Sequence, residues 1–263
     1  MTEVAAAGAH AEEGVTLMRA SSAPTAHAVV TVAPGEVGAH VGLSYRADDS
    51  GARRHLHLAW HHRLQNDEAL GDDVLWVVPG VDDVALADVS NAAHLIARQH
   101  ADGRVPYAFQ KGASRFTDGG VLELNGSLGL TCATFVELVF VSADVALLDT
   151  PTWDTGRSPE RTAEDDAAQR KLVNYLRCTR DAEAHAAQVE KEVPCTRIRA
   201  EEIAAASGMT GHPIPFARAE PEGARILAAV QAPRKPRAPD VPSPSEIASR
   251  QIEASPGEPA PEA

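Results

Sequence analysis

The feature that most constrains the fold is a pair of alternating segments on either side of a turn. In "AHVGLSY", His40, Gly42 and Ser44 alternate with Val41, Leu43 and Tyr45, and in "RRHLHLAW", His55, His57 and Ala59 alternate with Leu56, Leu58 and Trp60. Between them "DDSG" is typical of a tight turn. The pattern predicts a β-hairpin with one apolar face and one histidine-bearing face. In a register that keeps the faces aligned, His40 and His57 lie opposite or diagonal to one another.

A second constraint comes from "NGSLGLTCATFVELVF", residues 125–140. Counted from Cys132, apolar residues recur at helical spacing at Phe135, Val136 and Val139, so the cysteine belongs to a buried helical stripe. Thr131 is an acceptable N-cap, which places Cys132 in the first turn. There the helix dipole and free backbone N–H groups favour a thiolate and suit a developing oxyanion. A buried cysteine that only packs is the competing interpretation.

The rest of the chain predicts a single large domain with polar ends. We expect a poorly ordered segment at 1–24, a domain at 25–231 with a helical extension toward its C-terminal end, and a disordered proline-rich tail at 232–263. Within the domain, "DVLWVVPG" indicates a strand, "DDVALADVSNAAHLIARQHADG" a helix, and the stretch from 161 to 231 further helices. The expected class is α+β, with an antiparallel sheet packed against the cysteine helix.

Charge and cysteine content limit the possible partners. The formal net charge of −13, without a clustered basic face, argues against a nucleic acid or an anionic membrane as the main partner. The N-terminal stretch lacks the pattern of a secretory signal and no run reaches transmembrane length, so we expect a cytoplasmic protein, with export by an unmarked route left open. Cys132, Cys178 and Cys195 form no CxxC pair, which favours free thiols. Cys178 and Cys195 have no histidine pattern beside them.

Taken in order, "GAHVGLSY", "HLHLAW", "VPYAF" and "LTCATFVELVF" resemble the circularly permuted branch of the NlpC-like, papain-like cysteine hydrolases, which includes the lecithin:retinol acyltransferase-like enzymes. The resemblance covers about residues 35–145 and has the permuted order, with the histidine strand before the cysteine helix. It implies a permuted papain-like fold, Cys132 as nucleophile, His40 as base and His57 as the residue that orients the base, with His55 as the alternative third residue. The stretch from 145 to 231 has no counterpart in it, and the membrane-anchoring segments of the acyltransferases are missing.

The resemblance implies a hydrolase without a metal or an organic cofactor. Its substrate contains an amide or an ester, as in a peptide, a peptidoglycan fragment or an acylated molecule, and cleavage of an amide bond is the leading expectation. Acyl transfer to an amine or alcohol and deamidation of a protein side chain use the same thiol chemistry. Two further alternatives stay open. The domain is a non-catalytic binding module if Cys132 only packs. It is a metal-dependent hydrolase if His55 and His57, two apart on a strand, bind zinc or iron with His40, His61 or Cys132 as third ligand.

Overall fold

The computed structural model describes residues 15–19, 25–47, 52–68, 70 and 74–232. Contacts divide the chain into two units, 1–231 and 232–263, and the fold below belongs to the first. Residues 1–14 and 20–24 of the predicted N-terminal segment, the "DDSG" turn and nearly all of the predicted tail lie outside the described residues. The predicted N-terminal segment also contains a short strand, β1, that pairs with the sheet, because the described residues Leu17–Arg19 lie beside Leu75–Val77.

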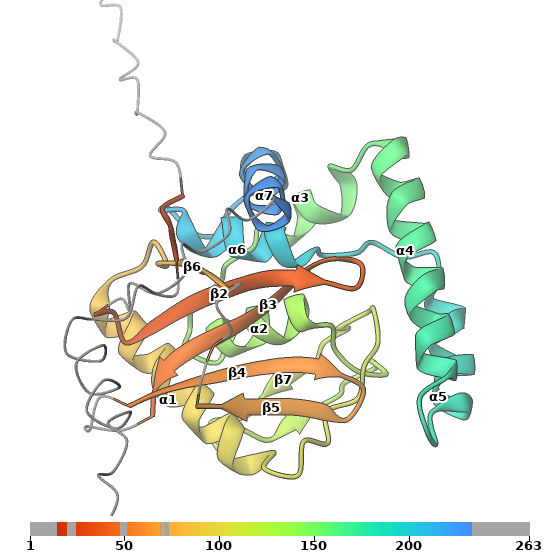
Figure 1. Ribbon diagram of the computed structural model, residues 1–263, viewed down its shortest axis with the longest axis horizontal. Helices are drawn as coiled ribbons and strands as arrows, with labels where there is room; N and C mark the ends of the chain where they lie inside the picture. The colour runs from red at the N-terminus through yellow and green to blue at the C-terminus, as the bar shows by residue number, and fades with distance from the viewer. Residues whose placement is uncertain (1–14, 20–24, 48–51, 69, 71–73, 233–263) are drawn as a thin grey trace, which may run out of the picture. The chain divides into compact units, whose positions relative to one another are not determined.

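Within the described residues, six strands form one antiparallel sheet in the order β1-β6-β2-β3-β4-β5 (Figure 1). Their bounds are β1 Leu17–Arg19, β2 Ala28–Gly35, β3 Gly38–Arg46, β4 Arg53–Trp60, β5 Arg63–Asp67 and β6 Leu75–Val77. A small separate pair joins β7 Arg115–Phe116 to β8 Leu122–Glu123. The α+β class and the antiparallel sheet expected from the alternating segments are therefore confirmed.

The histidine hairpin forms as β3 and β4. Its recorded pairing runs from Leu43↔Leu56 to Arg46↔Arg53. In the described part of the chain, the first half of β3 pairs with β2 alone, because no ladder joins residues 38–42 to β4. The two strands of the hairpin thus separate at the end that carries His40 and His57, which leaves backbone groups of β3 free for other contacts.

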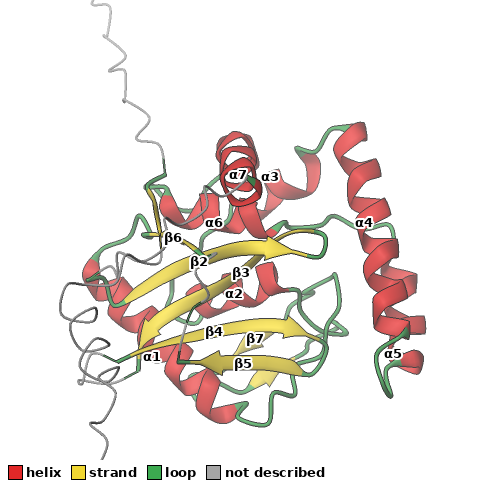
Figure 2. Cartoon of the chain, viewed as in Figure 1, coloured by secondary structure: helices red, strands yellow, loops and turns green. Residues whose placement is uncertain are grey.

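Helices cover the apolar face of this sheet (Figure 2). Helix α1 Asp83–Gln99, α2 Cys132–Val141, α6 Ala200–Gly208 and α7 Phe216–Gln231 each contact central strands. The fully buried core joins strand residues to helix residues, including Val41, Leu43, Leu56, Leu58, Ile96, Phe135, Val136, Phe140, Ile203 and Ile226. This packing buries the side of β3 and β4 that carries Val41 and Leu58, so the histidines of the two strands project from the opposite side.

The region from 161 to 231 contains helices, as its pattern predicts, and a short helix that was not predicted, α3 Thr150–Thr155, precedes it. Besides α6 and α7 this part of the chain contains α4 Pro159–Arg177, α5 Glu183–Val189 and the 3₁₀ turn Glu190–Glu192. Ser158 caps α4 by accepting a hydrogen bond from the backbone N–H of Arg161, and Pro159 follows at the first helical position. A second apolar cluster lies under α4 and α5 and includes Tyr107, Leu172, Leu176 and Val189.

A buried ionic network ties α4 to α6. Glu202 accepts hydrogen bonds from both Arg157 and Arg161, and Asp165 accepts from Arg199 at 2.8 Å and from Arg157 at 3.3 Å. Charges buried this deeply persist only when paired and hydrogen bonded. The network therefore fixes the position of α4 against the rest of the domain.

Among the helices of the described residues, none combines the length and the apolar composition needed to cross a bilayer.

Candidate active site

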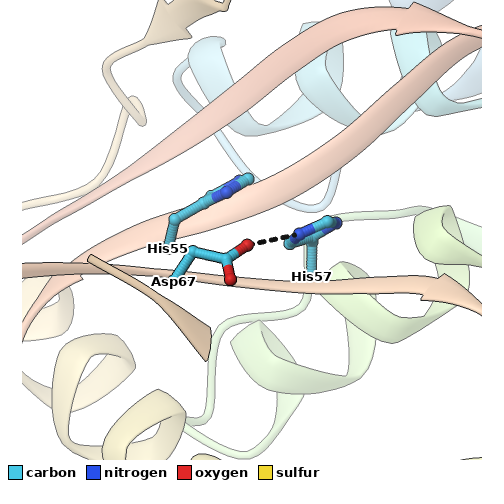
Figure 3. A group of neighbouring side chains, drawn as sticks. All are labelled: His55, His57 and Asp67. Atoms are coloured by element: carbon cyan, nitrogen blue, oxygen red, sulfur yellow. Dashed lines mark hydrogen bonds and ion pairs between the residues drawn. The ribbon is translucent and has the colours of Figure 1, made fainter. Parts of the chain in front are cut away.

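The structure brings His40 and His57 together. The Nε2 atom of His40 lies 2.8 Å from Nδ1 of His57, and the rings meet edge to face with centroids 5.0 Å apart. The other nitrogen of His57, Nε2, lies 3.1 Å from Oδ2 of Asp67 on β5 (Figure 3). Three side chains from three adjacent strands therefore form one hydrogen-bonded chain, as the face-aligned register predicts for the two histidines.

The carboxylate at one end of this chain of hydrogen bonds determines which atom donates in each of them. A carboxylate only accepts, so His57 donates its Nε2–H to Asp67 and, as a neutral imidazole, carries a bare Nδ1. That bare nitrogen accepts the Nε2–H of His40. The remaining nitrogen of His40, Nδ1, is then unprotonated and able to take a proton. The chain from Asp67 through His57 thus selects the tautomer of His40 that a general base requires.

Burial keeps these imidazoles neutral. It lowers the pKa of His40 to about 4, and burial together with the neighbouring His57 and His40 lowers the pKa of His55 to about 3. Burial and then the charge of His40 also lower the pKa of His57, although the carboxylate of Asp67 opposes the change. Uncharged rings agree with the hydrogen-bond directions deduced above.

Gly42 makes room for the histidines. A Cβ atom at this position would lie 2.6 Å from Nε2 of His55 and 2.8 Å from Cβ of His57. The two rings lie across β3 at this point, stacked with centroids 4.5 Å apart, and His55 reaches Oγ1 of Thr31 on β2 at 2.8 Å. The glycine in "HVGLSY" is therefore required by the close approach of side chains from β4, which the alternating pattern does not reveal.

Cys132 is the first residue of α2. Thr131 is the N-cap, its hydroxyl accepts the backbone N–H of Thr134, and the hydroxyl of Thr134 in turn accepts the backbone N–H of Thr131. The predicted helix start is thus confirmed to the residue. Cys132 is half-buried, and a hydrogen bond from the backbone of Val41 favours its thiolate; Val41 follows His40 in the half of β3 that pairs with β2 but not with β4.

The electrostatics of the thiol differ from the expectation. Burial is the largest influence and raises the pKa of Cys132, while the Val41 and Ala133 backbones and the charge of Arg197 only partly offset it. A cysteine at a helix start is therefore not sufficient for a resting thiolate here. Both partners of the resting site, the Cys132 thiol and the His40 imidazole, are neutral.

One pocket joins the thiol to the two histidines. It has a volume of about 860 Å³, and its lining includes the parts of β3 and β4 that do not pair with each other. Its lining residues are Pro34, Gly35, Glu36, Val37, Ala39, His40, His57, Leu58, Ala59, Trp60, Arg63, Tyr107, Cys132, Leu172, Tyr175 and Arg197. Among the described residues no hydrogen bond joins Cys132 to His40, and in ligand-free active sites such contacts are often long until substrate binds.

Tyr107 is a site residue that pattern analysis did not single out for chemistry. Leu130 bridges to Tyr107 and donates its N–H to the carbonyl of Pro106, an approach so close that a Cβ on Gly129 would lie 2.4 Å from that carbonyl oxygen. Tyr107 and Cys132 line the same pocket; burial raises the pKa of the Tyr107 phenol, and a negative charge on Cys132 raises it further. The only sequence signal is the Pro-Tyr pair in "RVPYAF".

Two histidines hold the backbone of Tyr107. Its N–H donates to Nδ1 of His61 at 3.2 Å, and its carbonyl accepts from Nε2 of His185 at 2.8 Å. His61 is buried, and burial lowers its pKa to about 4. His61 therefore binds the backbone of Tyr107 and is not part of the group formed by His55, His57 and Asp67.

Arg197 supplies a cation to the pocket. It lies within the stretch predicted to be helical but precedes α6, which begins at Ala200, and it lines the same pocket as Cys132. Nothing in "CTRIRAEE" marks it, because the contact depends on how the 145–231 region folds over the sheet.

Comparison with protein-family models, with curated proteins and with solved structures finds no match. The site is therefore interpreted from its own geometry.

A metal site at the hairpin is the main structural alternative. Ligand atoms of His55, His57 and Asp67 lie within 4.8 Å of one another (Figure 3), so the third member of this group is Asp67 and not His40, His61 or Cys132 as the sequence analysis supposed. The His55 and His57 rings are stacked at an interplanar angle of 14°. A metal binds in the plane of an imidazole about 2 Å from its nitrogen, and two separated, nearly parallel planes share no such point.

The nitrogens of His57 are also already engaged, one by His40 and the other by Asp67. Metal binding would require His57 to turn and both hydrogen bonds to break. The geometry therefore fits a hydrogen-bonded relay better than a metal site.

The other two cysteines are less suited to catalysis. Cys178 is exposed at the C-terminal end of α4. Cys195 packs against Gln169, and burial followed by the charge of Glu192 raises its pKa to about 11. Neither lines the pocket that contains His40.

Proposed function

We propose that the protein is a cysteine hydrolase of the permuted papain-like type that cleaves an amide bond, with Cys132 as nucleophile, His40 as general base and His57 as the residue that orients the base. The observation that carries the proposal is the 2.8 Å hydrogen bond between His40 and His57 in the pocket that contains the helix-start thiol. Asp67 extends the triad by fixing the tautomer of His57.

The chemistry starts from neutral partners. As the sulfur of Cys132 forms a bond to the carbonyl carbon, His40 takes the thiol proton on Nδ1 and becomes an imidazolium, which His57 and Asp67 stabilise. The charge that develops on the carbonyl oxygen is stabilised by N–H groups in the first turn of α2 and by the Tyr107 hydroxyl. His40 then protonates the departing amine, and water, activated by His40, hydrolyses the thioester.

Acyl transfer and side-chain deamidation share these steps and differ only in the acceptor or in the amide attacked. Hydrolysis of an amide is proposed because the resemblance to the NlpC-like hydrolases favours it.

The proposal is tested by acylation of Cys132 with a small neutral activated ester, 4-nitrophenyl acetate, followed by release of nitrophenolate and by intact mass. We expect a Cys132 acetyl adduct whose formation rate falls by about 10²-fold or more in His40→Ala, in line with the usual contribution of a general base. Asp67→Asn is expected to lower the rate about five- to tenfold, the value of one orienting hydrogen bond.

Matched controls separate these effects from general ones. Cys178→Ser removes an exposed thiol, and Glu68→Gln removes a neighbouring exposed carboxylate that pairs with Arg54. Both are expected to behave as wild type. Acetylation that is equally fast in His40→Ala would mean that Cys132 is an ordinary thiol, and loss of activity on chelation with EDTA would favour the metal site.

A further inference from the structure

The pocket differs in charge from the protein around it. The chain carries a formal net charge of −13, yet the described pocket lining contains two arginines, Arg63 and Arg197, and one acid, Glu36. Arg63 and Glu36 are exposed, whereas the side chain of Arg197 is only 13% exposed. A largely buried cation in the wall of this pocket requires a reason, because its burial costs hydration energy.

The carboxylates near Arg197 supply only part of that reason, because its charge acts on the buried carboxyl groups of Asp165 and Glu201 without a short ion pair to either one among the described residues. The nearest recorded carboxylate, Asp165, lies 3.9 Å from Nη1 of Arg197, and Asp165 already accepts from Arg199 at 2.8 Å and Arg157 at 3.3 Å. The one hydrogen bond recorded for Arg197 within the described residues runs from Nη2 to the carbonyl of Val37 at 3.4 Å. A guanidinium has five N–H donors, so most of its donor capacity remains for a ligand in the pocket.

The position of Arg197 relates it to the reacting centre. Arg197, Cys132 and Tyr107 line one pocket, and the charge of Arg197 partly offsets the rise that burial causes in the pKa of the thiol and of the phenol. The wall that faces it is apolar and aromatic. Trp60 packs on Tyr107 with ring centroids 4.6 Å apart and is anchored to the end of α4 by a hydrogen bond to Thr179, and Leu172 and Tyr175 of α4 complete this side.

From this arrangement we infer that Arg197 binds an oxyanion group of the substrate, a carboxylate or a phosphate, beside the scissile carbonyl, while Trp60, Leu172 and Tyr175 hold an apolar part of the same molecule. The inference rests on the proposed function for the carbonyl chemistry, and Arg197 determines which acyl compounds are accepted. Bidentate binding of planar or tetrahedral oxyanions is the interaction for which arginine is best suited.

The first test compares two alkylating reagents that differ in charge, iodoacetate and iodoacetamide, at one alkaline pH. The ratio of their rates at a given cysteine is independent of how much of that thiol is ionised, so the raised pKa of Cys132 cancels. We expect the iodoacetate-to-iodoacetamide ratio to be about tenfold higher at Cys132 than at the exposed Cys178 in the same sample, and to fall to the Cys178 value in Arg197→Gln.

Variants keep the test informative if Arg197→Gln is poorly folded. Arg197→Lys keeps the positive charge but loses the paired N–H donors of the guanidinium, and we expect it to retain part of the raised iodoacetate-to-iodoacetamide ratio at Cys132. Arg170→Gln, an exposed arginine of α4 that pairs with Asp166 and does not line the pocket, is the matched control and should keep the full ratio. A Cys132 ratio equal to that of Cys178 in the folded wild type would overturn the inference.

The second test uses acyl substrates. The 4-nitrophenyl esters of butyric acid, of glutaric acid as its monoester and of 4-phosphonobutyric acid present a neutral, a carboxylate and a phosphonate end. We expect kcat/KM for at least one anionic ester to exceed that of the neutral ester about tenfold, and this preference to disappear in Arg197→Gln. The better anionic ester identifies the carboxylate or the phosphate as the natural group.

The two proposals fail in different ways. If the neutral ester acylates Cys132 in a His40-dependent reaction and no ratio depends on Arg197, the hydrolase remains and the oxyanion site is wrong. If no ester acylates Cys132 while the alkylation ratio depends on Arg197, the oxyanion site remains and the hydrolase is wrong.

Discussion

Gly42 lies at a point in β3 where no Cβ atom fits. The absence of a Cβ lets His55 and His57 lie across β3, which is what brings His57 within 2.8 Å of His40. A single glycine thereby controls the geometry of the proposed base, although it makes no hydrogen bond to the site through a side chain of its own.

Gly42→Ala is predicted to displace both rings, because its methyl group would meet His55 and His57 at distances that carbon and nitrogen atoms do not adopt. We expect a loss of about 1–3 kcal/mol in the free energy of unfolding, measured with urea, and a larger fall in Cys132 acylation than in stability. Gly119→Ala is the control, since a Cβ there has only one neighbour, at 3.9 Å. Wild-type acylation in Gly42→Ala would show that the His40–His57 contact is not needed.

At the scale of elements, the start of α2 sets the place of the nucleophile. Thr131, which precedes Cys132, still has an extended backbone. The reciprocal hydrogen bonds between Thr131 and Thr134 fix the residue at which the helix begins. The thiol lies near the half of β3 that does not pair with β4, where the backbone of Val41 favours its ionised form. The start of α2 and the separation of β3 from β4 together determine the surroundings of the thiol.

Thr131→Ala is predicted to lower the free energy of unfolding by about 1–2 kcal/mol, because it removes the cap and leaves a buried hydroxyl of Thr134 without one of its partners. Thr131→Ser keeps the capping oxygen and is expected to lose less than half of that. Urea titration of the three proteins measures both values. Equal stability of the serine and alanine variants would mean that the cap does not hold this helix start.

At the scale of the molecule, buried neutral histidines link the fold to pH. The pKa values of His40, His55 and His61 are lowered to about 4, 3 and 4 by burial. Below about pH 6.5 the unfolded chain, whose histidines have pKa values near 6.5, binds protons at these positions, whereas the folded chain does not. The stability that these groups contribute is therefore fully present above about pH 6.5 and is lost as the pH falls toward 4.

His55→Gln is predicted to make the protein less sensitive to acid. Between about pH 6 and pH 4, the free energy of unfolding of wild type should fall more steeply than that of the variant, by up to about 1.4 kcal/mol per pH unit. Urea titrations at several pH values measure the difference. At pH 8 His55 is neutral in both the folded and the unfolded chain, so the difference in free energy of unfolding at that pH is the effect of the substitution apart from titration. Parallel curves for the two proteins would show that His55 titrates normally in the folded state.

The sequence by itself determined the elements: alternation set the faces of β3 and β4, and helical spacing with a threonine cap set the start of α2 at Cys132. These signals are local, because period and capping depend on residues within a few positions. Only the tertiary structure decided that Asp67, Tyr107 and Arg197 join the site, that burial raises the pKa of the thiol, and that a Cβ at Gly42 would collide with the histidines. Each of these depends on contacts between distant segments and on the exclusion of water, which no short pattern of residues encodes.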